Sequence, residues 1–383
     1  MGQTRKVFFL LGTPGVYERQ ILRGIAKYSH IHGPWSLFFD PVNRFNSRIR
    51  QKNLSADGII LGDVDFKITS QMNIPTITSS EFNPAPADIP CIQTDDEAIG
   101  RLGAEYLLQR NLRNLAYCGF EDMSWATHRG ESFFKTAAAA GIKVQQYKSK
   151  RAYLSILSAW EKEQAKLLAW IKSLPKPVGI MACNDYRGKH ILEVCELGGF
   201  SVPEEVAVLG VDNDEMICEL SGFALSSIAL NLEKAGYDAA KLLDNMMKGH
   251  KIHKANIVVK PTHVVTRRST NIIAINDSLV AQAVAFIREN IKKKIQVGDV
   301  VEALSVSPRN IEQRFQRELG RSIRDEILRV RTELIIWMLL ETNLSLQQIA
   351  VSAGYDNANY LFTSFRKQTG TTPGEYRKKY GKI

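Results

Sequence analysis

Two stretches of the C-terminal third repeat one pattern fifty residues apart, and they decide the fold of that region. Residues 303–320 read ALSVSPRNIEQRFQRELG, and residues 353–370 read AGYDNANYLFTSFRKQTG. Each stretch begins with a turn, continues with apolar residues four positions apart and ends at a glycine. A spacing of four places apolar side chains on one face of a helix. The repeat therefore predicts two helix-turn-helix units, each with the outer face of its second helix exposed.

Local signals support both units and a helix between them. The Ser307 hydroxyl can cap a helix, and Pro308 then fills the first helical position, where its missing N–H is not needed. Gly354 suits a turn with positive φ. Residues 324–341 have the apolar spacing of a helix that supplies the core of both units. The sequence places the two units at 297–318 and 346–369.

The first 270 residues follow a different pattern. Short apolar, β-branched segments alternate with helical stretches, which indicates βαβ units and parallel sheets. The expected strands are 6–11, 35–39, 58–61, 74–78, 115–118, 178–182 and 206–211, and the expected helices are 17–28, 97–109, 130–140, 157–173, 185–198 and 232–248. So many units exceed one sheet, so we expect a two-lobed α/β domain over 1–270 with two doubly wound parallel sheets. A linker at 271–277 then leads to an all-α domain at 278–383, whose first helix Asp277 or Ser278 can cap.

Composition narrows the class of protein. The chain has 383 residues, 44% hydrophobic and 23% charged, and no stretch approaches the ~20 apolar residues of a membrane-spanning helix. The apolar run 7–11 is shorter than the ~7 residues that a secretory signal needs. Five widely spaced cysteines, an odd number without a Cys-x-x-Cys pair, indicate a reducing compartment. We therefore expect a cytoplasmic protein.

Positive charge is denser toward the C-terminus. The net charge is +10, and the chain from Asn271 onward holds 17 Lys and Arg against 12 Asp and Glu. The first 270 residues hold 33 against 28, the same excess over more than twice the length. A denser positive field in the helical part favours a nucleic-acid partner, although basic solvated surfaces are also common.

Fixed spacings in the second unit carry a resemblance to a known family. They are Gly354-Tyr355 with Tyr360, Phe365-Arg366-Lys367, Gly370-Thr371-Thr372-Pro373 and Glu375-Tyr376-Arg377. With them, the last ~105 residues resemble the DNA-binding domain of AraC-type transcription regulators, which implies two DNA-binding helix-turn-helix motifs. Leu361-Phe362 departs from the family pattern, which more often has Phe followed by a small polar residue. This departure bears on packing in the second unit.

The first part of the chain resembles the sugar-sensing domain of LacI-type regulators and periplasmic binding proteins. The matching segments are 57–60 (DGII), 125–129 (WATHR), 184–185 (ND), 209–213 (LGVDN) and 264–270 (VVTRRST). A sensor of this kind followed by an AraC-type reader resembles the regulators of xylose operons in enteric bacteria. The resemblance implies an activator of pentose catabolism genes that responds to D-xylose and associates with the nucleoid.

The second helix of each unit presents side chains that can contact base edges. Arginine can bind guanine, glutamine can bind adenine, and glutamate can accept from cytosine in the major groove. Likeness to the AraC-type motif implies Arg309, Glu312, Gln313, Asn359 and Thr363 as the residues that contact bases, and Asn357 is expected on the same stripe of the second helix. Arg366 and Lys367, like Arg314 and Arg317, flank the stripes and are expected to bind phosphates. The two helices would enter successive major grooves ~34 Å apart on tandem half-sites. A solvated polar surface is the alternative.

Polar and aromatic residues gather where the expected strands end. Ligands of open parallel sheets bind beyond the carboxyl ends of the strands. A sugar needs carboxylates and amides for its hydroxyls and an aromatic ring for its C–H face. The resemblance implies Arg129, Asn184 and Asp212 as effector contacts, and the further candidates are Trp125, Tyr17, Glu81 and Asp185. Each of these residues could instead cap a helix or form an ion pair.

No group of residues suggests catalysis. The seven histidines show no metal-binding spacing, and neither a Gly-x-Ser-x-Gly motif nor a Cys–His pairing is evident. We therefore expect no enzyme, no cofactor and no metal. The expected partners are double-stranded promoter DNA, a monosaccharide effector, RNA polymerase and a second copy of the chain in a homodimer, with no membrane. A regulator that responds to another sugar or a sugar acid, a sugar-binding transport protein and a sugar-modifying enzyme are the alternatives.

Overall fold

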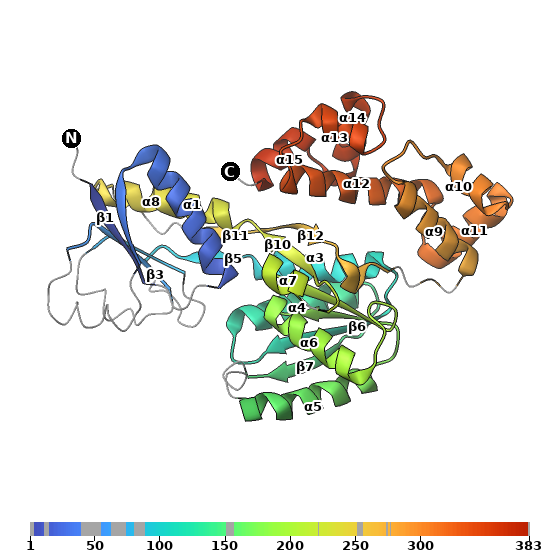
Figure 1. Cartoon of the computed structure of the whole chain (residues 1–383), viewed down its shortest axis with the longest axis horizontal. Helices are drawn as coiled ribbons and strands as arrows, with labels where there is room; N and C mark the ends of the chain where they lie inside the picture. Colours follow the sequence, from blue (N-terminus) through green and yellow to red (C-terminus); the bar gives the residue numbers. More distant parts are fainter. Residues whose placement is uncertain are drawn as a thin grey trace. The chain divides into compact units, whose positions relative to one another are not determined.

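The computed structural model describes residues 4–10, 15–39, 55–62, 74–79, 89–150, 157–220, 222–250, 256–272, 275 and 277–381. The chain forms two compact units (Figure 1). The second unit consists of residues 271–382 together with the short segment 106–113, and the first unit holds the remainder up to Thr270. Within the described ranges, none of the helices is long and apolar enough to cross a bilayer.

One lobe of the first unit is built on a parallel four-stranded sheet. Its strands are β1 (Arg5–Leu10), β2 (Trp35–Phe39), β3 (Gly58–Leu61) and β4 (Thr76–Thr78), in the order β2-β1-β3-β4. The helices α1 (Val16–His32) and α8 (Leu232–Met247) pack against each other in this lobe. A Cβ on Gly24 would overlap the Glu233 carbonyl oxygen, and a Cβ on Gly236 would overlap the Ile21 carbonyl oxygen. The two glycines therefore allow the close approach of α1 and α8.

The other lobe is built on a six-stranded sheet. Its strands are β6 (Asn114–Phe120), β7 (Gln145–Ser149), β8 (Val178–Ala182), β9 (Val206–Val211), β10 (Ser226–Leu230) and β12 (Pro261–Val265), in the order β12-β10-β9-β8-β6-β7. The edge strand β12 runs antiparallel to β10, and the other neighbours are parallel. The helices that accompany these strands are α3 (Asp96–Gln109), α4 (Ser124–Ala139), α5 (Leu157–Ser173), α6 (Asp185–Gly198) and α7 (Glu215–Leu220). Fully buried aliphatic side chains such as Ile180 and Val208 form the core.

A short parallel pair, β5 (Ile92–Thr94) with β11 (Ile257–Val259), completes the first unit. Thr78, at the end of β4, forms an isolated parallel bridge with Cys91. The predicted α/β fold with two sheets, followed by an all-α part, is confirmed, and the sheets are parallel as predicted except at the antiparallel edge strand β12.

Several elements differ from the sequence-based prediction. Helix α4 begins at Ser124 rather than at residue 130, because Trp125 and Ala126 are buried as residues of its first turn. Strand β4 begins only at Thr76, after Pro75, whose nitrogen has no hydrogen to donate to a sheet. The pattern missed β5, β7, β10, β11 and α7. Strand β7 reads QQYKS with mostly exposed residues, as suits an edge strand, so it shows no apolar run.

The second unit is helical. Its helices are α9 (Ser278–Asn290), α10 (Val297–Leu304), α11 (Pro308–Leu319), α12 (Ile323–Glu341), α13 (Leu346–Ser352), α14 (Ala358–Thr369) and α15 (Pro373–Tyr380). The long helix α12 passes from the α9–α11 group to the α13–α15 group (Figure 1). Ile327 of α12 packs in one core with Phe315, and Met338 packs in the other core with Phe365. The linking helix therefore supplies both cores, as its apolar spacing predicts.

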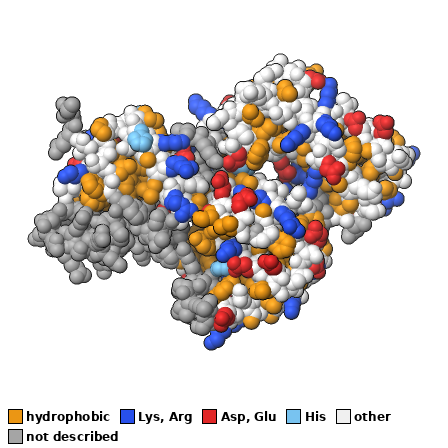
Figure 2. Space-filling view, viewed as in Figure 1, with side chains coloured by type: hydrophobic (Ala, Val, Ile, Leu, Met, Phe, Trp, Pro, Cys, Tyr) orange, Lys and Arg blue, Asp and Glu red, His pale blue; other side chains and the backbone are white. Residues whose placement is uncertain are grey.

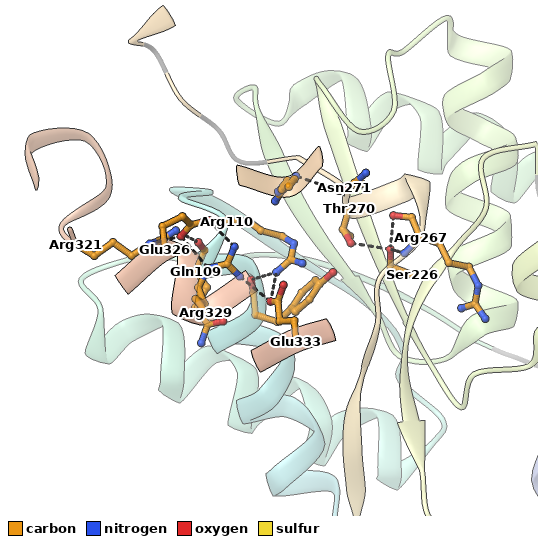
Figure 3. Close-up of polar contacts among 12 residues, drawn as sticks. Gln109, Arg110, Ser226, Arg267, Thr270, Asn271, Arg321, Glu326, Arg329 and Glu333 are labelled. Carbon is orange, nitrogen blue, oxygen red and sulfur yellow. Dashed lines mark hydrogen bonds and ion pairs between the residues drawn. The ribbon is translucent and has the colours of Figure 1, made fainter. Parts of the chain in front are cut away.

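A buried ion-pair network lies along α12 (Figure 3). The fully buried Glu326 accepts hydrogen bonds from Arg321 at 2.6 Å and from Arg329 at 2.7 and 2.9 Å. Arg329 also donates to Glu333 at 2.7 Å, and the Glu333 carboxylate lies 3.7 Å from the buried guanidinium of Arg110. These contacts attach the segment around Arg110 to the second unit.

Candidate functional site

A pocket opens between the first turn of α1 and the residues that follow β8 and β9. About 570 Å³ of space, which includes open solvent at the mouth, lies among its lining residues. The residues that line it are Gly15, Val16, Tyr17, Glu18, Trp125, Arg129, Asn184, Asp185, Tyr186, Asp212, Asp214 and Ile217. The structure thus brings together six of the seven expected effector contacts. The seventh, Glu81, lies outside the described residues.

Arg129 is the buried cation of the pocket. Its Nε donates to the Asp96 carboxylate at 2.9 Å, and its Nη1 donates to the Cys183 carbonyl oxygen at 2.7 Å. The same Nη1 lies 4.0 Å from Asp212 Oδ1. Burial lowers the pKa of Arg129, but the carboxylates of Asp96 and Asp212 outweigh burial and raise the pKa above its ordinary value. The guanidinium is therefore a fixed positive charge in a set orientation.

Trp125 and Asn184 add an aromatic face and an amide. The Arg129 guanidinium stacks over the Trp125 ring, 4.7 Å from the ring centre. Trp125 lines the pocket, and its buried Nε1 has no hydrogen-bond partner among the described residues. Asn184 caps α6, because its Oδ1 accepts the Arg187 backbone N–H at 2.9 Å. The Asn184 side-chain nitrogen takes no part in this capping hydrogen bond.

The turn after β9 holds its backbone in a strained conformation. The φ angle is +103° at Asp212 and +51° at Asn213, in the region that L residues rarely adopt. Such strain persists only where the surroundings hold it, and it clusters at ligand sites. The Asp212 side chain remains 19% exposed at the pocket wall, where it can accept hydrogen bonds from a ligand.

Other residues of the pocket were not predicted from the sequence. Asp96, the first residue of α3, accepts a hydrogen bond from Arg129. It was not predicted because it lies two positions after β5, a strand that the sequence pattern missed. Asp214 lies on the wall, 3.6 Å from Arg19 of α1. Its position two residues after Asp212, just past a predicted strand end, is a signal that could have found it. Glu18, Tyr186 and Ile217 complete the unpredicted polar and apolar wall.

The helix α11 exposes one stripe of the first helix-turn-helix unit. Ser307 caps it by accepting the Asn310 N–H, and Pro308 is its first residue, as predicted. Ile311 and Phe315 are fully buried, while Arg309 and Gln313 are exposed on the opposite face. Glu312 is half-buried at the flank of this stripe.

The helix α14 exposes the corresponding stripe of the second unit. Leu361 and Phe365 are fully buried. Four of the expected DNA-contacting residues are exposed on the other side: Asn359, Thr363, Arg366 and Lys367. Asn357 is exposed but lies just before the helix as its N-cap, where its Oδ1 accepts the N–H groups of residues 359 and 360. Its oxygen is therefore used by the cap, and its side-chain NH2 group takes no part in the capping hydrogen bonds.

Two arginines expected at phosphates are paired within the protein. Asp277 caps α9 with Oδ1, and its Oδ2 accepts from Arg314 at 2.7 Å and from Arg317 at 3.2 Å. In the view of Figure 2, acidic and basic side chains are interspersed over the helical unit. At Asp277, part of the positive charge of this unit is therefore paired within the protein.

No metal or disulfide chemistry accompanies these sites in the part of the chain that the structure describes. No group of three or more His, Cys, Asp and Glu residues could hold a metal ion there. All five cysteines are free thiols. Burial raises the pKa of Cys183, which lies beside Arg129, to about 12, so this thiol stays protonated.

Comparison with known proteins covers both parts of the chain. Residues 104–270 match the family of periplasmic binding protein-like domains, and residues 300–379 match the helix-turn-helix domain family. The xylose operon regulatory protein of Haemophilus influenzae is 31% identical over 98% of this chain and 98% of its own length. That of Escherichia coli K12 is 32% identical over 97% of this chain and 96% of its own length.

A solved structure agrees over the whole chain. It is described as the xylose-binding transcription activator XylR, it covers 99% of both chains at 29% identity, and its TM-score is 0.63. These relatives are transcription regulators, which confirms the prediction of a regulator rather than an enzyme. The chain therefore belongs to the family of xylose operon regulatory proteins, transcription regulators that join a periplasmic-binding-protein-like domain to a C-terminal AraC-type helix-turn-helix domain.

Proposed function

We propose that this chain activates pentose catabolism genes when D-xylose binds in the pocket of the first unit. In this proposal residues 1–270 are the sensor, 271–277 the linker and 278–383 the reader. The protein acts in the cytoplasm, at the nucleoid. It binds as a homodimer to tandem half-sites and contacts RNA polymerase there.

The observation that carries the sugar assignment is the arrangement around Arg129. The guanidinium is held by Asp96, lies near Asp212 and stacks on Trp125. A sugar hydroxyl donates to a carboxylate and accepts from a guanidinium or indole N–H, and its C–H face packs on a ring. Each of these groups is present on one wall of the pocket.

The charge of the pocket favours a neutral sugar over a sugar acid or sugar phosphate. Besides Asp185, whose oxygens are engaged within the protein, the carboxylates of Glu18, Asp212 and Asp214 line it against the single guanidinium of Arg129. An anionic ligand would meet like charges in a partly desolvated site, which is unfavourable. Among neutral sugars, the resemblance to xylose operon regulators then favours D-xylose as the effector.

Two exposed stripes of side chains, at equivalent positions of the repeat, support the proposal that this chain binds DNA. Arg309 and Gln313 on α11 correspond to Asn359 and Thr363 on α14 at the fifty-residue offset of the repeat. Both stripes lie opposite buried residues and carry groups that bind base edges. For the sensor to control these helices, D-xylose must bind one of two sensor states more tightly than the other.

A thermal-shift panel on the intact protein tests the sugar assignment. Ligand at a hundredfold excess over Kd stabilises the folded state by about 2.7 kcal/mol. We expect D-xylose to raise the Tm more than L-arabinose, D-ribose, D-glucose or D-xylonate. A shift with D-xylonate alone would favour the sugar-acid alternative, and turnover of a sugar during incubation would favour an enzyme.

A further inference from the structure

The strained turn 212–214 is held by one buried carboxylate. The Asp214 N–H donates to Asp185 Oδ2 at 2.7 Å, and the Ser227 hydroxyl donates to Asp185 Oδ1 at 2.6 Å. The same Ser227 oxygen accepts the Asn213 N–H at 3.0 Å. Two successive N–H groups of the turn are therefore tied, directly or through Ser227, to Asp185.

This arrangement is buried, and the absence of a side chain at Gly210 leaves space for it. Asp185, Ser227 and Asp214 are 1%, 0% and 5% exposed. Any Cβ on Gly210 of β9 would overlap Asp185 Oδ1, so only glycine at this position leaves space for the carboxylate. A buried carboxylate with internal donors on both oxygens is engaged by the protein and is not free for a ligand hydroxyl.

The hydrogen bonds that hold the turn 212–214 also position two carboxylates of the pocket, those of Asp212 and Asp214. Asp212, whose φ is +103°, reaches toward Arg129, and Asp214 faces Arg19 of α1. We propose that Asp185 is a positioning residue that holds the turn 212–214 in the conformation that binds the effector, and that effector affinity falls when its carboxylate takes up a proton. This inference rests on the proposed function, and it replaces a direct contact of Asp185 with the sugar by a role through Asp212.

The pKa of Asp185 lies near neutral pH. Burial raises the pKa of Asp185 to about 7; hydrogen bonds from Ser227, Asp214 and Cys218 oppose burial, and the Asp214 charge adds to it. The titratable groups that act on it are Asp214 of the turn and Cys218 of α7. One step further out, Arg19 of α1 lies 3.6 Å from Asp214, Arg267 acts on Cys218, and Arg129 of α4 lies 4.0 Å from Asp212. Burial raises the pKa of Cys218, so that thiol stays neutral.

Protonation weakens the hold on the turn. A neutral carboxyl forms hydrogen bonds about half as strong as those of a carboxylate. The added hydrogen also turns one oxygen into a hydroxyl, so either the Asp214 N–H or the Ser227 O–H then faces a weaker acceptor than a carboxylate oxygen. The weakened hydrogen bonds then offset less of the backbone strain of the turn. Asp212 therefore spends a smaller fraction of the time in the conformation that binds the effector.

The test is the D-xylose Kd by calorimetry at pH 6, 7 and 8. Where only the ionised form binds, a pKa of about 7 makes Kd about tenfold higher at pH 6 than at pH 8. Asp185→Asn should bind more weakly with a flat pH profile. Asp57→Asn is the matched control: its carboxylate accepts the Lys6 N–H in the other lobe, so it should keep the wild-type profile.

If Asp185→Asn folds poorly, a second variant and a second measurement still test the proposal. Ser227→Ala removes a donor that lowers the pKa of Asp185, so the midpoint of the wild-type profile should move to higher pH. Hydrogen exchange of residues 212–218, corrected for its intrinsic pH dependence, should be faster at pH 6 than at pH 8 without any sugar.

The outcomes separate the two proposals. A wild-type Kd that is equal at pH 6 and pH 8, or an Asp185→Asn variant that keeps the wild-type slope, overturns the role of Asp185 and leaves the sensor intact. Absence of D-xylose binding at every pH overturns the proposed effector instead. In that case the exchange measurement alone decides whether Asp185 holds the turn, since it requires no ligand.

Discussion

Arg129 Nε donates a hydrogen bond to the Asp96 carboxylate at 2.9 Å; the arginine side chain is buried and the Asp96 side chain is mostly buried. This bond fixes the plane of the guanidinium, which then faces Asp212 and stacks on Trp125. An arginine with a set plane offers its remaining N–H groups in a defined direction, so less conformational entropy is lost when a ligand binds. The pocket is thus organised before a sugar arrives.

The role of Asp212 is tested by Asp212→Ala. Loss of this carboxylate removes an acceptor for sugar hydroxyls, so D-xylose should no longer raise the Tm, whereas DNA binding without sugar should be unchanged. Asp238→Ala, at an exposed position of α8 where the side chain pairs with Lys234, should keep the full sugar response. Loss of DNA binding together with the sugar response would contradict a separate sensor and reader.

The reading role of α11 is tested by Arg309→Ala. If this side chain contacts a base edge, the variant should lose about 1–3 kcal/mol of binding to a specific duplex and little on random DNA. Fluorescence anisotropy on both duplexes measures this, with the exposed Lys172→Ala of α5 as control. An equal loss on both duplexes would reassign Arg309 to the phosphates.

The pairing of Asp277 predicts a change in salt dependence. Asp277→Asn keeps an oxygen to cap α9 but removes the charge that holds Arg314 and Arg317. Both arginines should then pair with phosphates, which makes the slope of log K against log[salt] steeper by up to about two. An unchanged slope between 50 and 200 mM salt would show that neither arginine gains a phosphate.

Gly354 is predicted to resist substitution. Its φ is +75°, and an added Cβ would overlap the Lys293 carbonyl oxygen. Gly370 has φ +76° with open space around it, so Gly370→Ala measures the backbone cost alone, about 1–2 kcal/mol. Gly354→Ala should lower the free energy of unfolding further, as urea denaturation measures. Equal losses at both positions would contradict the overlap.

The buried Glu326 should stabilise the reader in a pH-dependent way. Burial raises its pKa, but the hydrogen bonds and charges of Arg329 and Arg321 outweigh burial and hold the pKa below its ordinary value. Its contribution is therefore present above the unfolded pKa of about 4.3 and is lost as the pH falls through the lower folded value.

Glu326→Gln leaves Arg321 without its charge partner and Arg329 with Glu333 alone, and should cost up to about 3–5 kcal/mol at pH 7. The difference from wild type should shrink as the pH is lowered below about 4. Urea unfolding at several pH values measures it, with the exposed Glu302→Gln as control. A loss that is the same at all pH values would point to packing instead of charge.

The reader was predictable from sequence because its signals are local. The linking helix was expected at 324–341 and spans Ile323–Glu341, since a cap and an apolar period mark its ends. The cap Ser307 and the turn glycine Gly354 act within a few residues of their positions. Signals of this kind are present in any short window of the sequence.

The pocket was predictable only in part. The rule that ligands bind beyond strand ends, together with the family resemblance, placed Trp125 and Asp212 on its wall. The partners that orient the site lie far away in sequence: Asp96 is 33 residues from Arg129, and Ser227 is 42 residues from Asp185. Such pairings depend on how the elements pack, which no periodicity encodes. The sequence therefore indicates which residues meet a ligand better than which residues hold them.

The most direct test of the account is the effect of D-xylose on DNA binding by the full chain. A tandem-site duplex selected from a random pool would be titrated at pH 8, with and without saturating D-xylose, and its anisotropy recorded. The account predicts tighter binding with D-xylose for the wild type and no change for Asp212→Ala. Equal wild-type affinity with and without the sugar would contradict it.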